Sequence, residues 1–195
     1  IDLLKKKGES EYAKILLKLY KKIDESSIFW IRQHTLKGIG PATLLAEKII
    51  DNKPFLFHAG DLYIPQKNYL KQLIEIHNSE KPSATIGIRK VVDPRQFGVA
   101  NLKKLGKMKF EVTRLVEKPK NPSTNYALTG VNIFEPEIFN AIRKTKTGIN
   151  GEIQLTDSIQ TLIDTNHKVM ASIMRSKEQC IDIGTPKNYF KALSY

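Results

Sequence analysis

Two aspartates occur where a carboxylate can meet a ligand. Asp61 follows the apolar run at residues 55–59, and Asp182 lies in the apolar run at residues 180–183. Such runs predict buried strands, and open α/β sheets bind ligands at the carboxyl ends of their strands. Mg²⁺ prefers oxygen ligands and bridges phosphate oxygens, so the pair predicts a Mg²⁺ site. Asp61 alone is explained more simply as the cap of the next helix.

A Glu-Lys-Pro sequence offers a second kind of chemistry. Glu117 can accept paired hydrogen bonds from sugar hydroxyls, and Lys118 carries a compact positive charge that suits a phosphate. The alternative is a surface ion pair before a proline turn, and by itself this short sequence is a weak signal.

Gln33 lies shortly before two glycines, Gly38 and Gly40. The glutamine amide has one donating and one accepting side, which matches the edge of a pyrimidine base. The glycines let backbone approach a base closely. Without a ligand, the same residues form an ordinary loop and the start of a helix.

The composition limits the classes of function. Of the 195 residues, 41% are hydrophobic and 27% are charged, which is typical of a globular domain. The apolar runs are too short for a membrane-spanning helix, so no membrane partner is expected. The single cysteine, Cys180, excludes an internal disulfide and favours a reducing, cytoplasmic location.

The net charge of +12 leaves several partners open. A basic surface can bind nucleic acid or small polyanions such as nucleoside triphosphates, and it can also be a lysine-rich solvated surface. The lysines are not interleaved with aromatic residues as in single-strand binders, so nucleic acid is the less favoured partner.

Helical and strand patterns alternate along the first half of the chain. This alternation predicts an α/β domain with a mostly parallel sheet. A β-hairpin is expected within residues 97–116, and Thr156 is expected to cap a helix. The predicted helices span residues 11–23, 38–50, 69–77, 136–144, 156–164 and 186–193, and the predicted strands span residues 27–33, 55–59, 84–88, 125–134, 169–174 and 180–183.

The order of these residues resembles the sugar-1-phosphate nucleotidyltransferases along nearly the whole chain. Residues 31–40, 117–119 and 151–157 are most similar to the branch that uses UTP, whereas residues 181–186 also resemble the branch that uses dTTP. The residues that carry the resemblance are Gln33, Gly38, Gly60, Asp61, Gly98, Glu117, Lys118, Gly130, Glu152, Thr156, Asp157, Asp182 and Gly184.

The resemblance implies a Rossmann-like α/β fold, with a mixed, mostly parallel sheet flanked by helices and a β-hairpin insertion. It implies nucleotidyl transfer from UTP to glucose 1-phosphate, giving UDP-glucose and pyrophosphate, with Mg²⁺ as cofactor and a homo-oligomeric assembly. Glucose-1-phosphate thymidylyl transfer from dTTP and a non-catalytic sugar-nucleotide-binding subunit stay open as alternatives.

The resemblance also implies a role for each matched residue. Gln33, Gly38 and Asp61 would bind the nucleotide, and Asp61 and Asp182 would hold the metal. Asp61 and Lys118 would be the catalytic residues. For Glu152 and Asp157, ligand contact and a charged helix start are equally good explanations. The sugar phosphate would be contacted by Gly98, Glu117, Lys118, Gly130 and Asn132.

The chain departs from the family pattern in several respects, which include Pro41 where the family often has histidine or aspartate and Cys180 where one branch often has tryptophan. The family's glycine-rich G-x-G-T-R loop, which holds the triphosphate, does not occur in the sequence. We therefore expect residues 1–195 to be a single nucleotidyltransferase domain, incomplete at its N-terminus and inactive by itself. Asn132 also stands where the family often has tyrosine.

Overall fold

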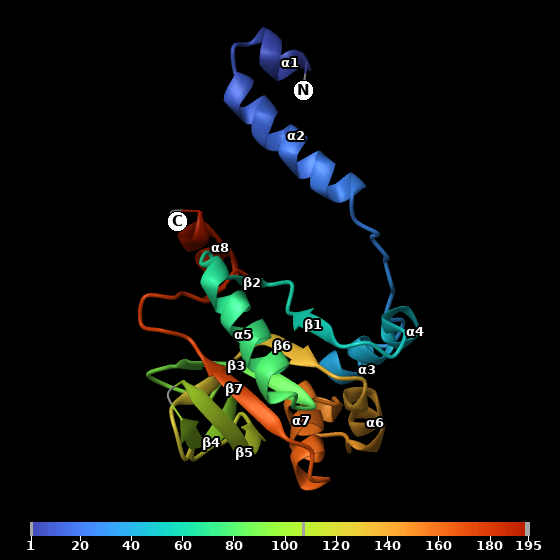
Figure 1. Ribbon diagram of the computed structural model, residues 1–195, viewed down its shortest axis with the longest axis vertical. Coiled ribbons are helices and arrows are strands. Elements are labelled where there is room, and N and C mark those ends of the chain that lie inside the picture. The colour runs from blue at the N-terminus through green and yellow to red at the C-terminus, as the bar shows by residue number, and fades with distance from the viewer. Residues whose placement is uncertain (1, 107, 194–195) are drawn as a thin grey trace. The chain divides into compact units, whose positions relative to one another are not determined.

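The computed structural model describes residues 2–106 and 108–193 (Figure 1). The chain separates into two compact units, Ile1–His34 and Thr35–Tyr195, and each is described by itself. The first unit contains helices α1 (Asp2–Lys6) and α2 (Ser10–Asp24). Helix α2 confirms the helix predicted at residues 11–23.

The strand predicted at residues 27–33 is wrong. This segment has no regular secondary structure, and its Trp30 side chain is 93% exposed. The aromatic and β-branched residues suit a strand, but such residues form one only when backbone groups of a neighbouring strand pair with them. None of the described strands pairs with this segment.

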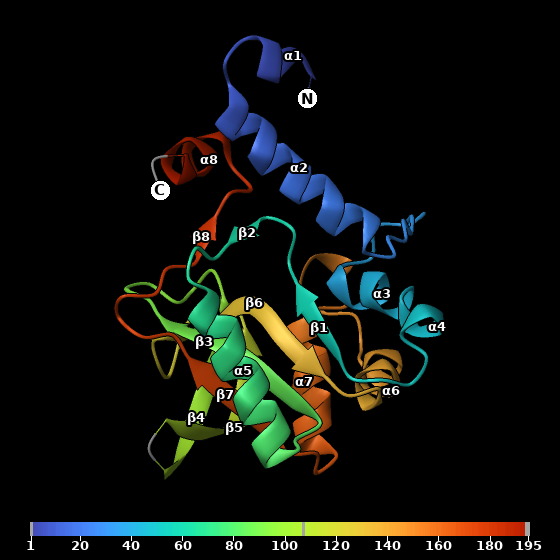
Figure 2. The same ribbon diagram turned by 45° about the horizontal axis from the view of Figure 1, so that its top comes forward.

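The second unit combines helices with a large sheet and a small one (Figures 1 and 2). Its elements, in chain order, are α3 (Ile39–Leu44), α4 (Glu47–Ile50), β1 (Phe55–His58), β2 (Leu62–Tyr63), α5 (Lys67–Glu80), β3 (Ala84–Lys90), β4 (Gly98–Gly106), β5 (Lys109–Glu117), β6 (Tyr126–Phe134), α6 (Glu137–Lys144), the 3₁₀ helix η1 (Ile149–Gly151), α7 (Leu155–Asp164), β7 (Val169–Ile173), β8 (Ile181–Asp182) and α8 (Pro186–Ala192).

The large sheet is mostly antiparallel, which corrects the expectation of a mostly parallel sheet. Its strand order is β1-β6-β3-β7-β5-β4, and of these neighbouring pairs only β3 and β7 run parallel. The mixed α/β class and the β4–β5 hairpin are confirmed.

The position of β6 explains why the alternation of helix and strand predicted a mostly parallel sheet. Strands β1 and β3 are both antiparallel to β6, so they run in the same direction, and α5 connects them as a crossover helix. Strand β6, which comes later in the chain, lies between them. Alternation of helix and strand therefore indicates the crossover but not which strand becomes the neighbour.

Helices cover both faces of the large sheet (Figures 1 and 2). On one face, Tyr69 and Leu73 of α5 pack against Val131 of β6. On the other face, α6 and α7 bury Ile142 and Ile159 against residues of the central strands. This three-layer arrangement fixes the strand ends from which the loops of the candidate site extend.

A two-residue antiparallel ribbon lies apart from the large sheet. In it, β2 pairs with β8 so that Leu62 faces Asp182 and Tyr63 faces Ile181. The backbone N–H of Ile183 also donates to the carbonyl oxygen of Asp61 at 2.7 Å. The ribbon thus joins two segments that are about 120 residues apart along the chain.

The β3–β6 pairing shifts register at Gly87, where residues 129–131 of β6 bulge opposite this single residue of β3. The backbone N–H of Gly87 donates to the side-chain Oδ1 of Asn132 at 3.2 Å. The register shift leaves the Gly87 N–H without a partner in the β3–β6 ladder. The buried side chain of Asn132 supplies the acceptor that this N–H needs. None of the described helices is long and apolar enough to span a bilayer.

We predict that Gly87→Ala destabilises the second unit strongly. A Cβ at this position would lie 2.5 Å from both the Tyr69 hydroxyl oxygen and the Val131 carbonyl oxygen, and it would also meet the Thr129 hydroxyl. We expect the free energy of unfolding to fall by about 2 kcal/mol or more, as measured by urea denaturation. Gly60→Ala is the control, because a Cβ there meets nothing within 4 Å. Equal stability of the two variants would contradict this packing.

Candidate nucleotide and metal site

The carboxylates of Asp61 and Asp182 border one small space beside Gly184. A Cβ built on Gly184 would lie 3.2 Å from Oδ2 of Asp61 and 3.1 Å from Oδ1 of Asp182. Both oxygens therefore lie next to the same residue, and their sharing of one metal ion stays a prediction. Both side chains are exposed and can reach a ligand from solvent.

Backbone hydrogen bonds hold the segment that carries Asp182. Its Oδ1 accepts from the backbone N–H of Gly184 at 2.7 Å. The hydroxyl of Thr185 accepts from the backbone N–H of Asn188 and so caps α8, and Pro186 occupies the first position of that helix. This local order fixes the carboxylate between the ribbon and the helix.

The donor set suits Mg²⁺ better than a transition metal. Within the described part of the chain, no group of three or more His, Cys, Asp and Glu side chains could hold a metal ion. Two carboxylates with free coordination positions are a typical protein contribution to Mg²⁺, which takes its remaining ligands from water and phosphate. Asp61 and Asp182 are the residues that would hold the ion.

A second group of polar residues meets where β4 and β5 pair. Gly98 faces Glu117 in the β4–β5 register. A Cβ on Gly98 would lie 2.7 Å from the Thr156 hydroxyl oxygen and 3.2 Å from Oε2 of Glu117. A larger residue at position 98 would fill the space in front of both side chains, so glycine keeps it open.

Thr156 lies beside this group and does not cap α7. The N-cap position belongs to Gln154, which makes no side-chain capping bond, and Thr156 is the second residue of the helix. The expected cap is therefore wrong. The sequence contained no signal that Thr156 would approach Gly98, because the contact depends on how α7 packs against the sheet.

Lys118 follows Glu117 with an unusual backbone conformation. Its φ is 41°, in the left-handed region that residues with a side chain rarely adopt. Its backbone N–H donates to the Phe97 carbonyl oxygen at 3.0 Å. The ammonium lies 3.9 Å from Glu117 Oε1, and the Lys118 side chain is 43% exposed while that of Glu117 is 12% exposed. Strained backbone held in this way is common at ligand sites.

Gly130 and Asn132 lie in different surroundings although both belong to β6. Gly130 has a φ of 77°, and a Cβ there would lie 2.6 Å from Cδ1 of Leu62, next to the ribbon. Asn132 is 2% exposed and accepts from Gly87. The structure places Gly130 close to the Asp61 segment and Asn132 within the sheet.

Gly38 packs against the segment before α7. Its φ is 97°, and a Cβ there would lie 2.8 Å from the Ile153 carbonyl oxygen. The backbone N–H of Ile153 donates to the Lys37 carbonyl oxygen at 2.9 Å. This close pairing of two chain segments requires glycine at position 38. Gln33, the other expected base contact, belongs to the first unit.

Glu152 and Asp157 lie near this packing. Oε2 of Glu152 accepts from Nε2 of Gln154 at 2.9 Å. Burial raises the pKa of Asp157 above its usual value. A Cβ on Gly148 would lie 2.9 Å from Oδ2 of Asp157. These contacts suit a charged loop and helix start, and they leave ligand contact by either residue as a prediction.

Comparisons with known proteins agree on one family. The profile of the family described as "Nucleotidyl transferase" matches residues 8–195. A protein of Methanocaldococcus jannaschii named putative UTP–glucose-1-phosphate uridylyltransferase is 34% identical over 194 residues, which cover 97% of this chain and 65% of that protein. UTP–glucose-1-phosphate uridylyltransferase 2 of Staphylococcus saprophyticus is 34% identical over 166 residues, covering 82% of this chain and 56% of that protein.

The fold is also similar to a solved structure. A crystal structure of UDP-glucose pyrophosphorylase complexed with UDP-glucose matches 94% of this chain and 71% of that chain, with a TM-score of 0.84 and 28% identity. The present chain thus spans less than two thirds of the length of the two curated relatives above.

We predict that Asp61→Asn and Asp182→Asn each weaken metal binding. Each substitution removes one of two carboxylate charges, so the affinity for Mn²⁺, a spectroscopic substitute for Mg²⁺, should fall roughly tenfold or more. Electron paramagnetic resonance of free Mn²⁺ measures the change. Asp164→Asn, at the C-terminal end of α7 in the same unit, is the control and should leave the affinity unchanged. If either site variant binds Mn²⁺ as the wild type does, the two carboxylates do not share an ion.

Proposed function

Because the chain belongs to the nucleotidyl transferase family, we propose that it serves uridylyl transfer from UTP to glucose 1-phosphate, yielding UDP-glucose and pyrophosphate. The names of the two relatives at 34% identity support this choice of substrates. The observation that carries the proposal is the meeting of the Asp61 and Asp182 carboxylates beside Gly184. A carboxylate pair of this kind suits a reaction that concentrates negative charge on phosphates.

The reaction is an in-line displacement at phosphorus. A phosphate oxygen of glucose 1-phosphate attacks the α-phosphorus of UTP and forms a new P–O bond. The bond to the β-phosphate oxygen breaks, and its electron pair leaves with pyrophosphate. No covalent intermediate on the protein is needed, so catalysis consists of positioning and charge neutralisation. When bound between Asp61 and Asp182, Mg²⁺ would supply positive charge to the phosphate oxygens.

Lys118 and Glu117 are proposed to bind the sugar phosphate. The Lys118 side chain is partly exposed and its backbone is held by Phe97, so its ammonium can turn from Glu117 to a phosphate without a change in the loop. Glu117 is largely buried beside Gly98, where it can accept hydrogen bonds from two sugar hydroxyls. Gly98, Gly130 and Asn132 complete the proposed sugar subsite.

Gly38 is proposed to contact the pyrimidine base, and for Gln33, in the first unit, the same role stays a separate prediction. Uracil and thymine present the same edge to an amide, so this pair does not separate UTP from dTTP. The two nucleotides differ in the 5-methyl group and the 2′-hydroxyl. Comparison of UTP with dTTP as the donor therefore tests the uridylyl assignment against thymidylyl transfer.

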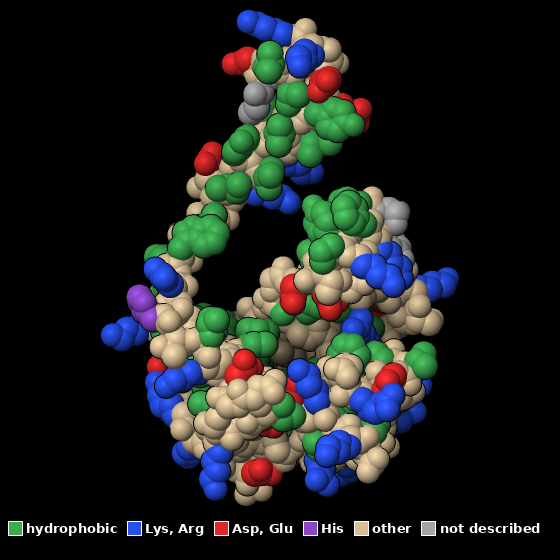
Figure 3. Space-filling model, turned by 180° about the vertical axis from the view of Figure 1, so that it is seen from behind, with side chains coloured by type: hydrophobic (Ala, Val, Ile, Leu, Met, Phe, Trp, Pro, Cys, Tyr) green, Lys and Arg blue, Asp and Glu red, His purple; other side chains and the backbone are tan. Residues whose placement is uncertain are grey.

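Nucleic-acid binding remains the weaker alternative. On the face shown in Figure 3, the Lys and Arg side chains are scattered over the second unit and do not gather in one stripe. A continuous basic stripe is the usual footprint of a nucleic-acid-binding protein. Dispersed charge supports a solvated surface that attracts small anions.

We also propose that the transfer needs a glycine-rich loop to hold the pyrophosphate. Such loops use backbone N–H groups with basic side chains, and these 195 residues contain no G-x-G-T-R sequence. On this proposal residues 1–195 are one incomplete nucleotidyltransferase domain. Kinetic tests therefore use a polypeptide in which this chain is joined to a segment with that loop.

We predict that Lys118→Ala lowers kcat/KM for glucose 1-phosphate roughly a hundredfold or more, because a charge on the reacting phosphate is lost. Lys118→Arg should restore only part of the activity, since a planar guanidinium replaces a compact charge. The rate is measured as the release of pyrophosphate from UTP in a coupled assay.

The neighbouring exposed Lys120 offers a matched control. Lys120→Ala should retain wild-type kinetics, and unchanged kinetics in Lys118→Ala would remove Lys118 from the site. Transfer from dTTP at a higher kcat/KM than from UTP would contradict the uridylyl assignment while leaving the family's chemistry intact.

A further inference from the structure

Arg89 makes contacts that lead to two different parts of the proposed transfer site. It lies near the end of β3 and lines a cavity of about 890 Å³. The same cavity is also lined by Phe97, Cys180 and Asp182. Asp182 belongs to the proposed metal site, and Phe97 directly precedes Gly98 of the proposed sugar subsite.

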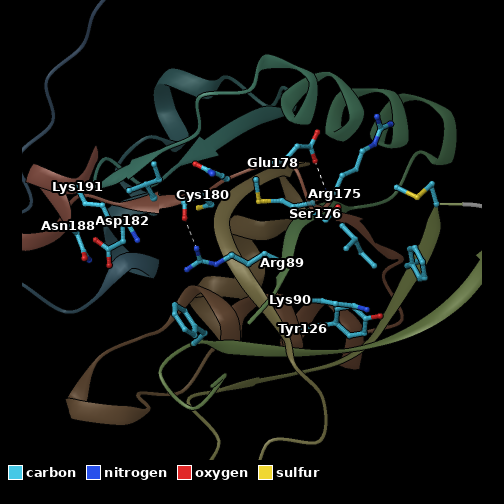
Figure 4. Close-up of a pocket in the computed structure, with 17 residues that line it drawn as sticks. Arg89, Lys90, Tyr126, Arg175, Ser176, Glu178, Cys180, Asp182, Asn188 and Lys191 are labelled. Atoms are coloured by element: carbon cyan, nitrogen blue, oxygen red, sulfur yellow. Dashed lines mark hydrogen bonds between the residues drawn. The ribbon is translucent and has the colours of Figure 1, made fainter. Parts of the chain in front are cut away.

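One contact of Arg89 is with the segment that carries Asp182. Its Nη1 donates to the carbonyl oxygen of Cys180 at 2.6 Å, as the dashed line in Figure 4 marks. Cys180 directly precedes β8, so this bond acts next to the strand that carries the Asp182 carboxylate. A hydrogen bond from a charged donor is stronger than one between neutral groups.

Few other hydrogen bonds tie this segment to the large sheet. Within the described part of the chain, the other bond from residues 175–180 to the sheet runs from the Cys180 thiol to the Thr129 carbonyl oxygen at 3.8 Å. A thiol is a weak donor. The Arg89 guanidinium therefore provides the stronger of these two links between the segment before β8 and the large sheet.

The other contact of Arg89 leads to the proposed phosphate-binding lysine. Cζ of Arg89 lies 5.1 Å from the centroid of the Phe97 ring. The Phe97 carbonyl oxygen accepts from the Lys118 backbone N–H at 3.0 Å, where Lys118 has its left-handed φ of 41°. A guanidinium can donate through its edge while its face lies on an aromatic ring, so one group serves both contacts.

The proposed reaction makes the distance between these two parts important. A metal held by Asp61 and Asp182 and the ammonium of Lys118 would act on phosphate groups of the same reacting pair. The two aspartates lie in or beside the β2–β8 ribbon, whereas Lys118 follows β5 of the large sheet. A misplacement of about 1 Å can lower a rate about a hundredfold. A side chain that fixes the ribbon against the sheet thus affects the reaction without touching the substrate.

We propose that Arg89 is a positioning residue, which fixes the metal-binding ribbon relative to the Lys118 backbone. This role rests on the proposed function, which places the metal and the phosphate in these two parts. Arg89 holds the segment before β8 through Cys180, and it holds the Lys118 backbone through Phe97. Its loss changes how the two parts act together, and it leaves each part intact.

The test measures how strongly Mn²⁺ and UDP-glucose promote each other's binding. UDP-glucose can span both parts, because its diphosphate can reach the metal while its glucose lies in the sugar subsite. Calorimetry gives the affinity of the 195-residue chain for UDP-glucose with and without saturating Mn²⁺, and the ratio of these affinities is the coupling factor. We expect a coupling factor of roughly ten or more for the wild type.

Arg89→Met should reduce the coupling factor to about two or less, because the ribbon is no longer fixed against the sheet. The affinity for Mn²⁺ alone should stay within about twofold of the wild type, because the ribbon that joins the two aspartates is unchanged. Unfolding would lower both quantities, so a change in coupling alone identifies positioning. Arg89→Lys should restore most of the coupling, because an ammonium can still donate to the Cys180 carbonyl oxygen.

Arg175→Met is the matched control. Arg175 is exposed in the wall of the same cavity, and its side chain makes no hydrogen bond or ion pair with the described residues, so the coupling factor should equal that of the wild type. Phe97→Leu removes the ring and should lower the coupling factor as Arg89→Met does. Combining these two substitutions should lower it no further, because both break the same bridge. The melting temperature of each variant shows that it is folded.

A wild-type coupling factor in Arg89→Met would overturn the positioning role and leave the proposed function standing. So would a loss of Mn²⁺ affinity in Arg89→Met as large as in Asp182→Asn, because Arg89 would then act on the metal site itself. A wild type that shows no UDP-glucose binding, or no coupling with Mn²⁺, would contradict the proposed function and the positioning role with it.

Discussion

The pairing of β2 with β8 is the interaction on which the proposed site depends. It consists of two facing residue pairs and one further backbone bond from Ile183 to Asp61, yet it joins distant parts of the chain. Because Asp61 precedes β2 and Asp182 lies in β8, this pairing brings the two carboxylates to the same side of Gly184. Gly130 has no side chain to displace Leu62 of β2, so the ribbon can lie close to the sheet.

Local patterns in the sequence predicted most elements, and they drew attention to the two aspartates for which the metal role is proposed. The helix at α2, the β4–β5 hairpin and the aspartates beside apolar runs depend on short-range periodicity, which the sequence displays directly. The direction of the sheet could not be predicted in this way. The place of β6 between β1 and β3 depends on long-range pairing. The segment at residues 27–33 also depends on long-range pairing. Its residues favour a strand, but none of the described strands pairs with it.

Some side chains make contacts in the fold that their residue type alone does not predict. Asn132, which we propose at the sugar, also accepts through its amide oxygen from the backbone N–H of Gly87. Thr156 was expected as a helix cap and lies instead beside Gly98. The sequence gave no reason to single out Arg89, because an arginine at the end of a predicted strand is common. The fold places it in the wall of a cavity, and its buried Nε has no hydrogen-bond partner among the described residues.

The central claim is that the ribbon assembles a single metal site from Asp61 and Asp182. The most direct test is a crystal structure with Mn²⁺ and UDP-glucose, in which anomalous scattering locates the manganese. The account predicts one anomalous peak at about 2.2 Å from a carboxylate oxygen of each aspartate, with a diphosphate oxygen completing the coordination. A peak bound to only one of them, or a bound nucleotide sugar whose manganese lies elsewhere, would contradict it.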